Sequence, residues 1–216
     1  MSTYNNLCAS KVSHYTGIDL DTGRLRQRHR SSIVPHEFID ADLDSPWRVG
    51  KFDLIFASEV IEHILDDRRL FANLFEHLSD DGVLVITTPN KPFVQRIARV
   101  LPGFDAISAS QDGGHVRVGY DCDGLLKLAD EYPLTTISRS FLGRISIREL
   151  RRRDAMRKHS DFANTARFNA SWLMRHALRR EHAGVREDQY WSLAMVFQNC
   201  GKASSEVARP GFGFRR

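Results

Sequence analysis

Short apolar runs alternate with amphipathic stretches along most of the chain. Six runs have the length and the β-branched or aromatic content of buried strands, and they lie at residues 15–20 (YTGIDL), 36–39 (HEFI), 52–58 (FDLIFAS), 83–88 (VLVITT), 135–141 and 190–198 (YWSLAMVFQ). Strands that alternate with helical segments are typical of α/β proteins. The pattern therefore predicts an α/β fold with a mostly parallel sheet flanked by helices.

Helical spacing of apolar residues marks the segments between these runs. Residues 59–78 read as one helix with Val60, Ile64, Leu70 and Leu74 on one side, and residues 79–82 (SDDG) would end it. A shorter helix is predicted at 123–132. Residues 91–114 read as a long connection.

No internal repeat or low-complexity linker divides the chain. Residues 1–216 are therefore predicted to form a single domain. Its core would comprise 15–141 and 190–198, a helical insert or lid would occupy 144–183, and 199–216 would be a polar tail.

Positive charge is concentrated in one segment. The net charge of the chain is +4, yet residues 144–182 alone contain eleven Lys and Arg against four Asp and Glu. The segment has apolar positions at Phe168, Trp172 and Leu173, which favours an amphipathic helix packed on the domain with a solvated basic face. The alternative is a lid that recruits an anionic acceptor. No RNA-binding signature accompanies it, so nucleic acid is not indicated.

Targeting and redox features are sparse. No apolar run is long enough for a transmembrane helix, and the first residues lack the apolar region of a secretory signal. The three cysteines are scattered without a CxxC pair, which argues against a disulfide framework. A cytoplasmic location is therefore expected.

Polar residues follow the predicted strands at the edge where open α/β sheets bind ligands. The motifs are FDLIFASEVIEHI, then SDDGVLVITTPN, then GGHVRVGY. Upstream, Asp19 closes a strand, where a carboxylate accepts hydrogen bonds from ribose hydroxyls. Asp42 is expected to end the next strand, where a carboxylate meets an exocyclic adenine amine.

This succession of motifs resembles the class I, Rossmann-like methyltransferases that use S-adenosylmethionine. The resemblance covers roughly residues 15 to 140 and the last strand. It implies S-adenosylmethionine as the cofactor, with Asp19 on the ribose and Asp42 on the adenine. It also implies a pocket for the methionine end of the cofactor, lined by Ala57, Ser58 and Glu59.

One part of the family pattern has no counterpart. The first strand and its glycine-rich loop, of the form D-x-G-x-G-x-G, should precede Tyr15, but the fourteen residues before Tyr15 contain no glycine. An amino-terminally truncated sheet is therefore expected. Three explanations stay open: a start codon assigned too late, a fold completed by a partner chain or a second copy, and a degenerate paralogue.

Acidic residues and histidines gather after the 52–58 strand. On a helix Glu59, Glu62 and His63 would share one face, a spacing used by helical metal sites. The arrangement resembles metal-dependent methyltransferases that act on the 3′ ends of small RNAs, in which a later histidine, here His115, completes the site. Glu59, Glu62, His63 and His115 are thus candidate ligands of a divalent ion. The favoured alternative has no metal, a structural Glu62, and His63 or His115 as the general base.

The sequence therefore predicts methyl transfer from S-adenosylmethionine to an oxygen or nitrogen of a small or medium-sized acceptor. One alternative is a non-catalytic, methyltransferase-like partner subunit or a truncated gene product. Another is a metal-dependent 2′-O-methyltransferase that acts on an RNA 3′ end.

Overall fold

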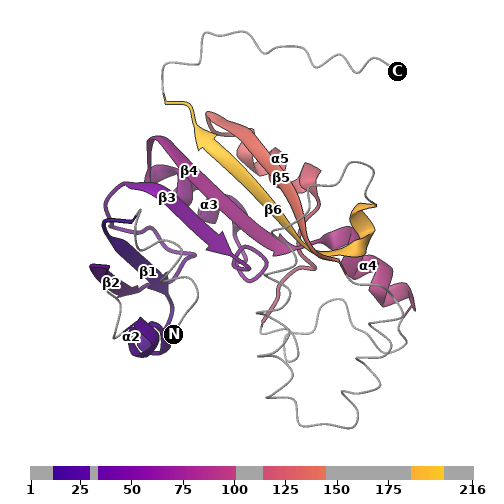
Figure 1. The fold of residues 1–216 in the computed structure, drawn as a ribbon, viewed down its shortest axis with the longest axis horizontal. Helices are drawn as coiled ribbons and strands as arrows, with labels where there is room; N and C mark the ends of the chain where they lie inside the picture. Colours follow the sequence, from indigo (N-terminus) through magenta and orange to yellow (C-terminus); the bar gives the residue numbers. More distant parts are fainter. Residues whose placement is uncertain (1–11, 30–33, 101–113, 145–185, 202–216) are drawn as a thin grey trace. The chain divides into compact units, whose positions relative to one another are not determined.

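The chain is represented by a computed structural model that describes residues 12–29, 34–100, 114–144 and 186–201 (Figure 1). They fall into two compact units, Met1–Val49 and Gly50–Arg216, and each unit is described by itself. The single domain expected from the sequence stays a prediction.

The first unit is a strand–helix–strand arrangement. Two strands, β1 (Tyr15–Asp19) and β2 (His36–Asp40), pair in parallel and are connected through helix α2 (Gly23–His29). Gly17 faces the ring of Phe38 so closely that a Cβ at this position would lie 2.7 Å from Phe38 Cδ1. A residue without a side chain is therefore needed where the two strands pack.

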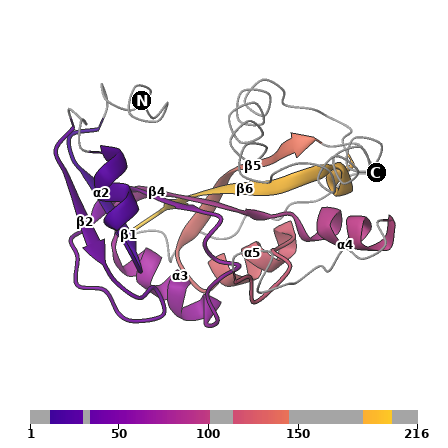
Figure 2. The same cartoon turned by 90° about the horizontal axis from the view of Figure 1, so that it is seen from below.

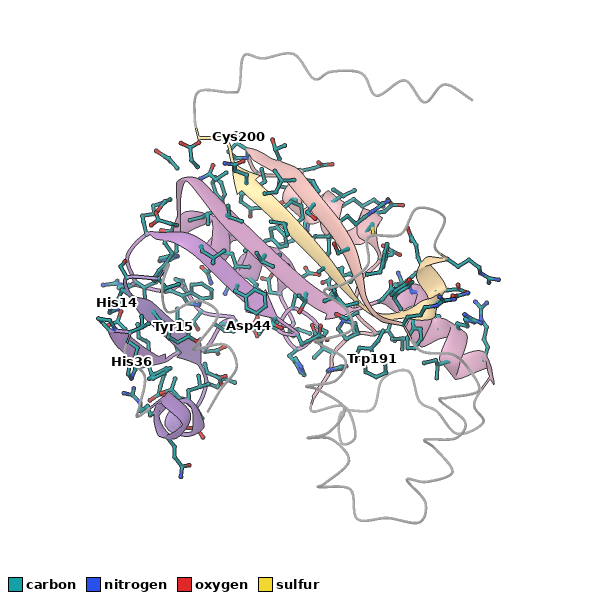
Figure 3. All side chains as sticks on the ribbon, in the orientation of Figure 1. His14, Tyr15, His36, Asp44, Trp191 and Cys200 are labelled. Atoms are coloured by element: carbon teal, nitrogen blue, oxygen red, sulfur yellow. The ribbon has the colours of Figure 1, made fainter. Side chains whose placement is uncertain are left out.

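The second unit is built on a four-stranded mixed sheet in the order β3-β4-β6-β5. Strands β3 (Phe52–Ser58) and β4 (Leu78–Pro89) are parallel, and β6 (Tyr190–Asn199) is antiparallel to both β4 and β5 (Leu134–Arg144). Because β6 runs the opposite way, its first residues lie where β3 and β4 end. Trp191 and Cys200 mark the two ends of β6 in Figure 3.

Helices cover one face of this sheet. Helix α3 (Asp67–Glu76) and helix α5 (Cys122–Ala129) lie on the same side of it, and α4 (Lys91–Val100) extends from the end of β4 (Figure 2). The core is apolar and fully enclosed, with Phe71, Leu84, Ile86, Leu125, Leu193 and Phe197 all at 0% exposure. Each such side chain stabilises the fold by roughly 1.5–3 kcal/mol. No helix within the described ranges is long and apolar enough to cross a membrane.

The other face of the sheet is more open. Along β3, Leu54 and Phe56 point away from the core residues and are 56% and 50% exposed. They pair in register with Val83 and Val85 of β4, which are half-buried. One sheet thus combines a closed apolar face with an accessible one.

The α/β architecture and all six strand positions predicted from the sequence are confirmed. Two other predictions were wrong. Residues 79–82 continue β4 instead of ending a helix, and the connection after β4 begins with helix α4. Pro92 is compatible with that helix because it stands in the first turn, where a backbone N–H has no intrahelical acceptor. The predicted basic insert, residues 144–183, lies outside the described residues beyond Arg144, the last residue of β5.

Candidate active site at the carboxyl ends of β3 and β4

The segment after β3 is an irregular turn, and α3 begins only at Asp67. The predicted helix over 59–78 is therefore wrong in its first part. Glu59 has a φ of 52°, in the left-handed region, which a right-handed helix does not allow. Asp66 then caps α3 by accepting a hydrogen bond of 3.0 Å from the Arg69 amide. The shared helix face expected for the acids does not exist.

Glu59 is held between strands. Its amide donates to the Thr87 carbonyl at 2.9 Å, and its Oε1 accepts from the Ser192 hydroxyl at 2.7 Å. Burial raises the pKa of Glu59, against the lowering effect of the Ser192 hydrogen bond. The side chain therefore connects the end of β3 with the beginning of β6.

Glu62 is completely buried, at 0% exposure. Its Oε2 accepts from the Thr88 hydroxyl at 3.2 Å. Among the described residues no hydrogen bond reaches its Oε1. Burial raises the pKa of Glu62 to about 7, and the nearby charge of Glu59 adds to the increase. A buried carboxyl oxygen without a partner is costly, which points to a proton or a cation at this position.

Two histidines lie beside this carboxyl group. The ring centroids of His63 and His115 are 4.4 Å apart, and the two rings meet edge to face at an interplanar angle of 75°. His63 Nε2 lies 4.0 Å from Glu62 Oε1. One ligand atom from each of Glu62, His63 and His115 lies within 4.8 Å of the other two. We call these three residues the acid–histidine cluster. Glu59, the fourth predicted ligand, is not part of it.

Arg117 fixes the turn that carries the cluster. Its guanidinium donates to the carbonyls of Ile61 and Ile64, each at 2.8 Å, and to that of Leu65 at 2.9 Å. In addition, the Val116 amide donates to the Glu62 carbonyl at 2.9 Å. These bonds replace the hydrogen bonds that a helix would have supplied, and they bring His115 against His63. The sequence showed Arg117 only as part of an H-x-R motif, since its acceptors are backbone carbonyls more than fifty residues away.

The segment that carries His115 is anchored to β4. The Tyr120 amide donates to the Pro89 carbonyl at 3.1 Å, and the Tyr120 carbonyl accepts from the Lys91 amide at 3.0 Å. Gly119 allows this approach: its φ is +95°, and a Cβ there would lie 1.9 Å from the Pro89 carbonyl oxygen. The hydroxyl of Tyr120 also donates to Asp67, at the start of α3.

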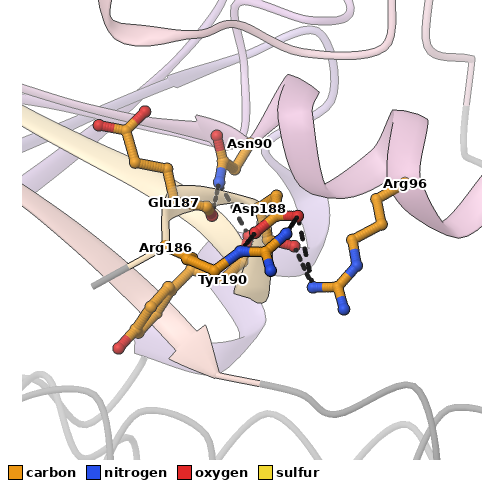
Figure 4. A network of polar contacts seen from close by, with 6 residues as sticks. All are labelled: Asn90, Arg96, Arg186, Glu187, Asp188 and Tyr190. Atoms are coloured by element: carbon orange, nitrogen blue, oxygen red, sulfur yellow. Dashed lines mark hydrogen bonds and ion pairs between the residues drawn. The ribbon is translucent and has the colours of Figure 1, made fainter. Parts of the chain in front are cut away.

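The remaining residues of this edge close the ends of β3 and β4. Ala57 is buried, and the exposed Ser58 lies with its Oγ 3.0 Å from Thr87 Oγ1. Asn90 is buried, and its amide nitrogen donates to the carbonyls of Glu187 and Tyr190 at 2.7 and 3.0 Å (Figure 4). The first residues of β6 are thus locked to the end of β4.

The predicted ribose and adenine contacts belong to the first unit. Asp19 is the last residue of β1, is exposed, and accepts from the Asp21 amide at 3.3 Å. Asp42 does not end β2, as had been predicted. It lies in the turn that follows, is exposed, and accepts from the Asp44 amide at 2.9 Å. Their roles toward a cofactor stay predictions.

The strand-ending residue of β2 is Asp40, and it serves the fold. Its Oδ1 accepts from the amide and the hydroxyl of Thr22 at 2.8 and 2.7 Å. These hydrogen bonds lower the pKa of Asp40. The carboxylate therefore fastens the start of α2 to β2.

Similarity to known proteins identifies the family of this chain. A family model described as "Methyltransferase domain" matches residues 4–166 of the chain. The chain belongs to the methyltransferase domain family. Its α/β fold and its membership of a methyltransferase family agree with what its motifs predicted.

Individual relatives agree with this methyltransferase assignment. Trans-aconitate 2-methyltransferase of Escherichia coli is 30% identical over 79 residues, which are 37% of this chain and 31% of that protein. The matched part is thus less than a third of the relative's length. The solved structure of the N-methyltransferase NodS from Bradyrhizobium japonicum, in complex with S-adenosylhomocysteine, has a TM-score of 0.52 and 18% identity, and covers 91% of this chain and 72% of that one. The small RNA methyltransferase HEN1 has a TM-score of 0.55 and 15% identity, and covers 96% of this chain and 23% of that one. The two structures establish the fold of the methyltransferase and no acceptor.

Proposed function

We propose that this methyltransferase transfers the methyl group of S-adenosylmethionine to an oxygen or nitrogen of a small or medium-sized acceptor. The observation that supports the proposal is the acid–histidine cluster, which lies at the ends of β3 and β4, where open α/β sheets bind their ligands. S-adenosylmethionine, when bound, supplies the electrophilic methyl group.

Exposed carboxylates suit the ribose hydroxyls and the adenine amine of that cofactor. Asp19 and Asp42 each stand at or just after a strand of the first unit and are open to ligand hydroxyls and amines. In the proposal Asp19 binds the ribose, and Asp42 binds the adenine amine. Ala57, Ser58 and Glu59 border the methionine end.

The cluster supplies a proton acceptor beside the reacting atoms. As the new bond to the methyl carbon forms and the carbon–sulfur bond breaks, a hydroxyl or amine acceptor must lose its proton. The imidazole of His63 or His115 takes it. The carboxyl of Glu62 lies 4.0 Å from His63 Nε2, where its negative charge favours the protonated form of His63. An acceptor that is already an anion, such as a carboxylate, needs no base.

The test begins with cofactor binding. The 216-residue chain is titrated calorimetrically with S-adenosylhomocysteine, and binding in the micromolar range is expected. Methyl transfer is then measured with S-adenosylmethionine and a panel of carboxylates, phenols and amines. The first acceptor is trans-aconitate, since one relative is named for it. A folded chain that binds no S-adenosylhomocysteine would overturn the proposal and favour a non-catalytic partner subunit or a truncated gene product.

A second candidate function follows from the geometry of the same cluster. Glu62, His63 and His115 offer a carboxylate and two imidazoles within 4.8 Å of one another, and Glu62 Oε1 has no hydrogen bond from the described residues. This donor set fits Zn²⁺ or another divalent first-row ion. Such an ion lowers the pKa of a bound hydroxyl, which suits methylation of the 2′-hydroxyl at an RNA 3′ end.

Chelation separates the two candidates. With a proton acceptor alone, methyl transfer is unchanged after treatment with EDTA. With a metal centre, EDTA abolishes transfer, Mn²⁺ or Co²⁺ restores it, and Glu62→Gln weakens the binding of Co²⁺ measured by absorption spectroscopy. Full activity in EDTA removes the metal-dependent candidate.

A further inference from the structure

A basic hollow of about 420 Å³ lies beside α4 and the short helix η1 (Glu187–Gln189). Three guanidinium groups and one carboxylate line it, so positive charge is in excess. The lining residues are Pro92, Gln95, Arg96, Arg99, Arg186 and Asp188. No residue of the acid–histidine cluster contributes to it.

Asp188 holds two of these arginines in place (Figure 4). Arg186 donates from Nε and Nη2 to the two carboxylate oxygens of Asp188 at 3.3 and 3.0 Å. Arg96 Nη1 donates to the Asp188 carbonyl at 3.2 Å and lies 3.5 Å from its Oδ2. Each guanidinium has five N–H donors, more than one carboxylate accepts. Asp188 therefore positions both groups and leaves donor capacity for a ligand.

Arg99 adds a third positive group on the same side. It follows Arg96 by three residues on α4, and residues at this spacing are neighbours on a helix surface. Arg99 is exposed and forms no ion pair with the residues that the structure describes. Its charge is therefore available to an incoming anion.

The hollow is tied to the proposed active site. Asn90 ends β4, begins the path into α4, and donates to the carbonyls of Glu187 and Tyr190 at 2.7 and 3.0 Å. Two residues before it, Thr88 donates to Glu62. From Asn90 to Arg96 the chain advances roughly 9 Å along the helix. Arg96 in the hollow thus lies about one and a half helical turns beyond the end of β4.

We infer that the hollow binds an oxyanion, a carboxylate or a phosphate, on the methyl acceptor. The inference rests on the proposed function and specifies its substrate class. Planar guanidinium groups match the paired oxygens of carboxylates and phosphates, and the volume suits part of a small-molecule ligand. The hollow and Glu62 are both linked to the end of β4, through Asn90 and Thr88, so the rest of an acceptor anchored here is expected to extend toward that strand end.

The test measures binding of two probes to the full chain, citrate as a polycarboxylate and inorganic pyrophosphate as a phosphate, by calorimetry at low ionic strength. Arg99→Gln removes one charge without breaking a described ion pair. It is expected to weaken the binding of the tighter-binding probe about fivefold. Arg96→Gln combined with Arg99→Gln is expected to weaken it about thirtyfold. Arg68→Gln is the matched control, since Arg68 is an exposed arginine of α3, paired with Glu131 outside the hollow.

Each outcome has one meaning. Weaker binding for the two hollow variants and unchanged binding for Arg68→Gln supports the inference, and the better probe identifies carboxylate or phosphate. Equal binding by wild type and the double variant, with an unchanged melting temperature, overturns it. Equal losses in all three variants also overturn it, because they indicate a general charge effect. Titration with S-adenosylhomocysteine tests the proposed function separately, since none of these arginines is assigned to the cofactor.

Discussion

Both units of the molecule place acidic residues at or shortly after strand ends, but in opposite surroundings. In the first unit Asp19 and Asp42 are exposed, and each accepts a hydrogen bond from an amide two residues further along the chain. In the second unit Glu59 and Glu62 are at least partly buried, and their hydroxyl partners Ser192 and Thr88 lie on other strands.

The difference in burial suits the two pairs of acids to different tasks in the proposed function. An exposed carboxylate keeps its hydration and exchanges it for ligand hydroxyls at modest cost. A buried carboxyl loses its hydration, so its protonation depends on its neighbours, and the pKa of Glu62 rises to about 7. Groups that exchange protons near neutral pH are the ones that general acid–base catalysis needs. The exposed pair is thus suited to recognition and the buried group to proton handling.

Replacing His63 gives the largest expected effect. If the acid–histidine cluster handles the proton, His63→Gln lowers kcat about 10²- to 10³-fold with a neutral acceptor, and affinity for S-adenosylhomocysteine is unchanged. His14→Gln, at a histidine of the first unit that lies near Glu37, is the control. An unchanged kcat in the His63 variant would place the chemistry outside the cluster.

The pH dependence of stability isolates Glu62. The pKa of Glu62 is about 7 in the folded chain and near the ordinary value of 4.5 in the unfolded chain. The folded state therefore binds the proton more tightly. The resulting stabilisation is fully present below pH 4.5 and is lost as the pH rises through 7, amounting to about 3 kcal/mol at most. The free energy of unfolding, measured in urea with EDTA between pH 5 and 8, should fall more steeply for wild type than for Glu62→Gln. Parallel curves would contradict the assignment.

Arg117→Lys tests the support of the cluster. Lysine keeps the charge but lacks the fork that reaches three carbonyls at once. The free energy of unfolding should fall by about 2 kcal/mol, and kcat should fall with it because His63 loses its fixed position against His115. Arg68→Lys, in an exposed ion pair, is the control and should change stability by less than about 0.5 kcal/mol. Equal losses of unfolding free energy in the two variants would show that Arg117 does not support the cluster.

Asp19→Asn gives the smallest expected effect and tests the exposed side of the comparison. Loss of the charged acceptor should weaken the binding of S-adenosylhomocysteine about tenfold and leave kcat at saturating cofactor unchanged. Asp21→Asn, at a neighbouring acid that caps the Gly23 amide, should bind normally. A loss of kcat without a loss of affinity would mean that Asp19 takes part in the chemistry.

Strand positions followed from the sequence because burial on a sheet needs a continuous apolar run. FDLIFAS matches β3 residue for residue, and YWSLAMVFQ matches β6 to within one residue. Glu62, His63 and His115 were also identified in advance, since they follow strand ends or the TPN turn. They were expected to meet as candidate metal ligands together with Glu59, and the structure brings the three together without Glu59.

The path between these residues could not be predicted. Ile61 and Ile64 are spaced as on a helix, but a compact turn buries apolar residues as well, and the left-handed Glu59 and the carbonyl bonds of Arg117 stabilise the turn instead. The bond between Ser192 and Glu59 joins residues 133 positions apart. Local patterns carry no information about such contacts.

Gly119 limits what evolution or a library can change in this protein. A side chain at this position would lie within 1.9 Å of the Pro89 carbonyl oxygen, and the backbone there is in the left-handed region. In a saturation library screened for folded protein, codon 119 should retain only glycine, whereas neighbouring Val116, 42% exposed, should accept many residues. The conservation of glycine at this codon would then reflect the close approach of two backbone segments.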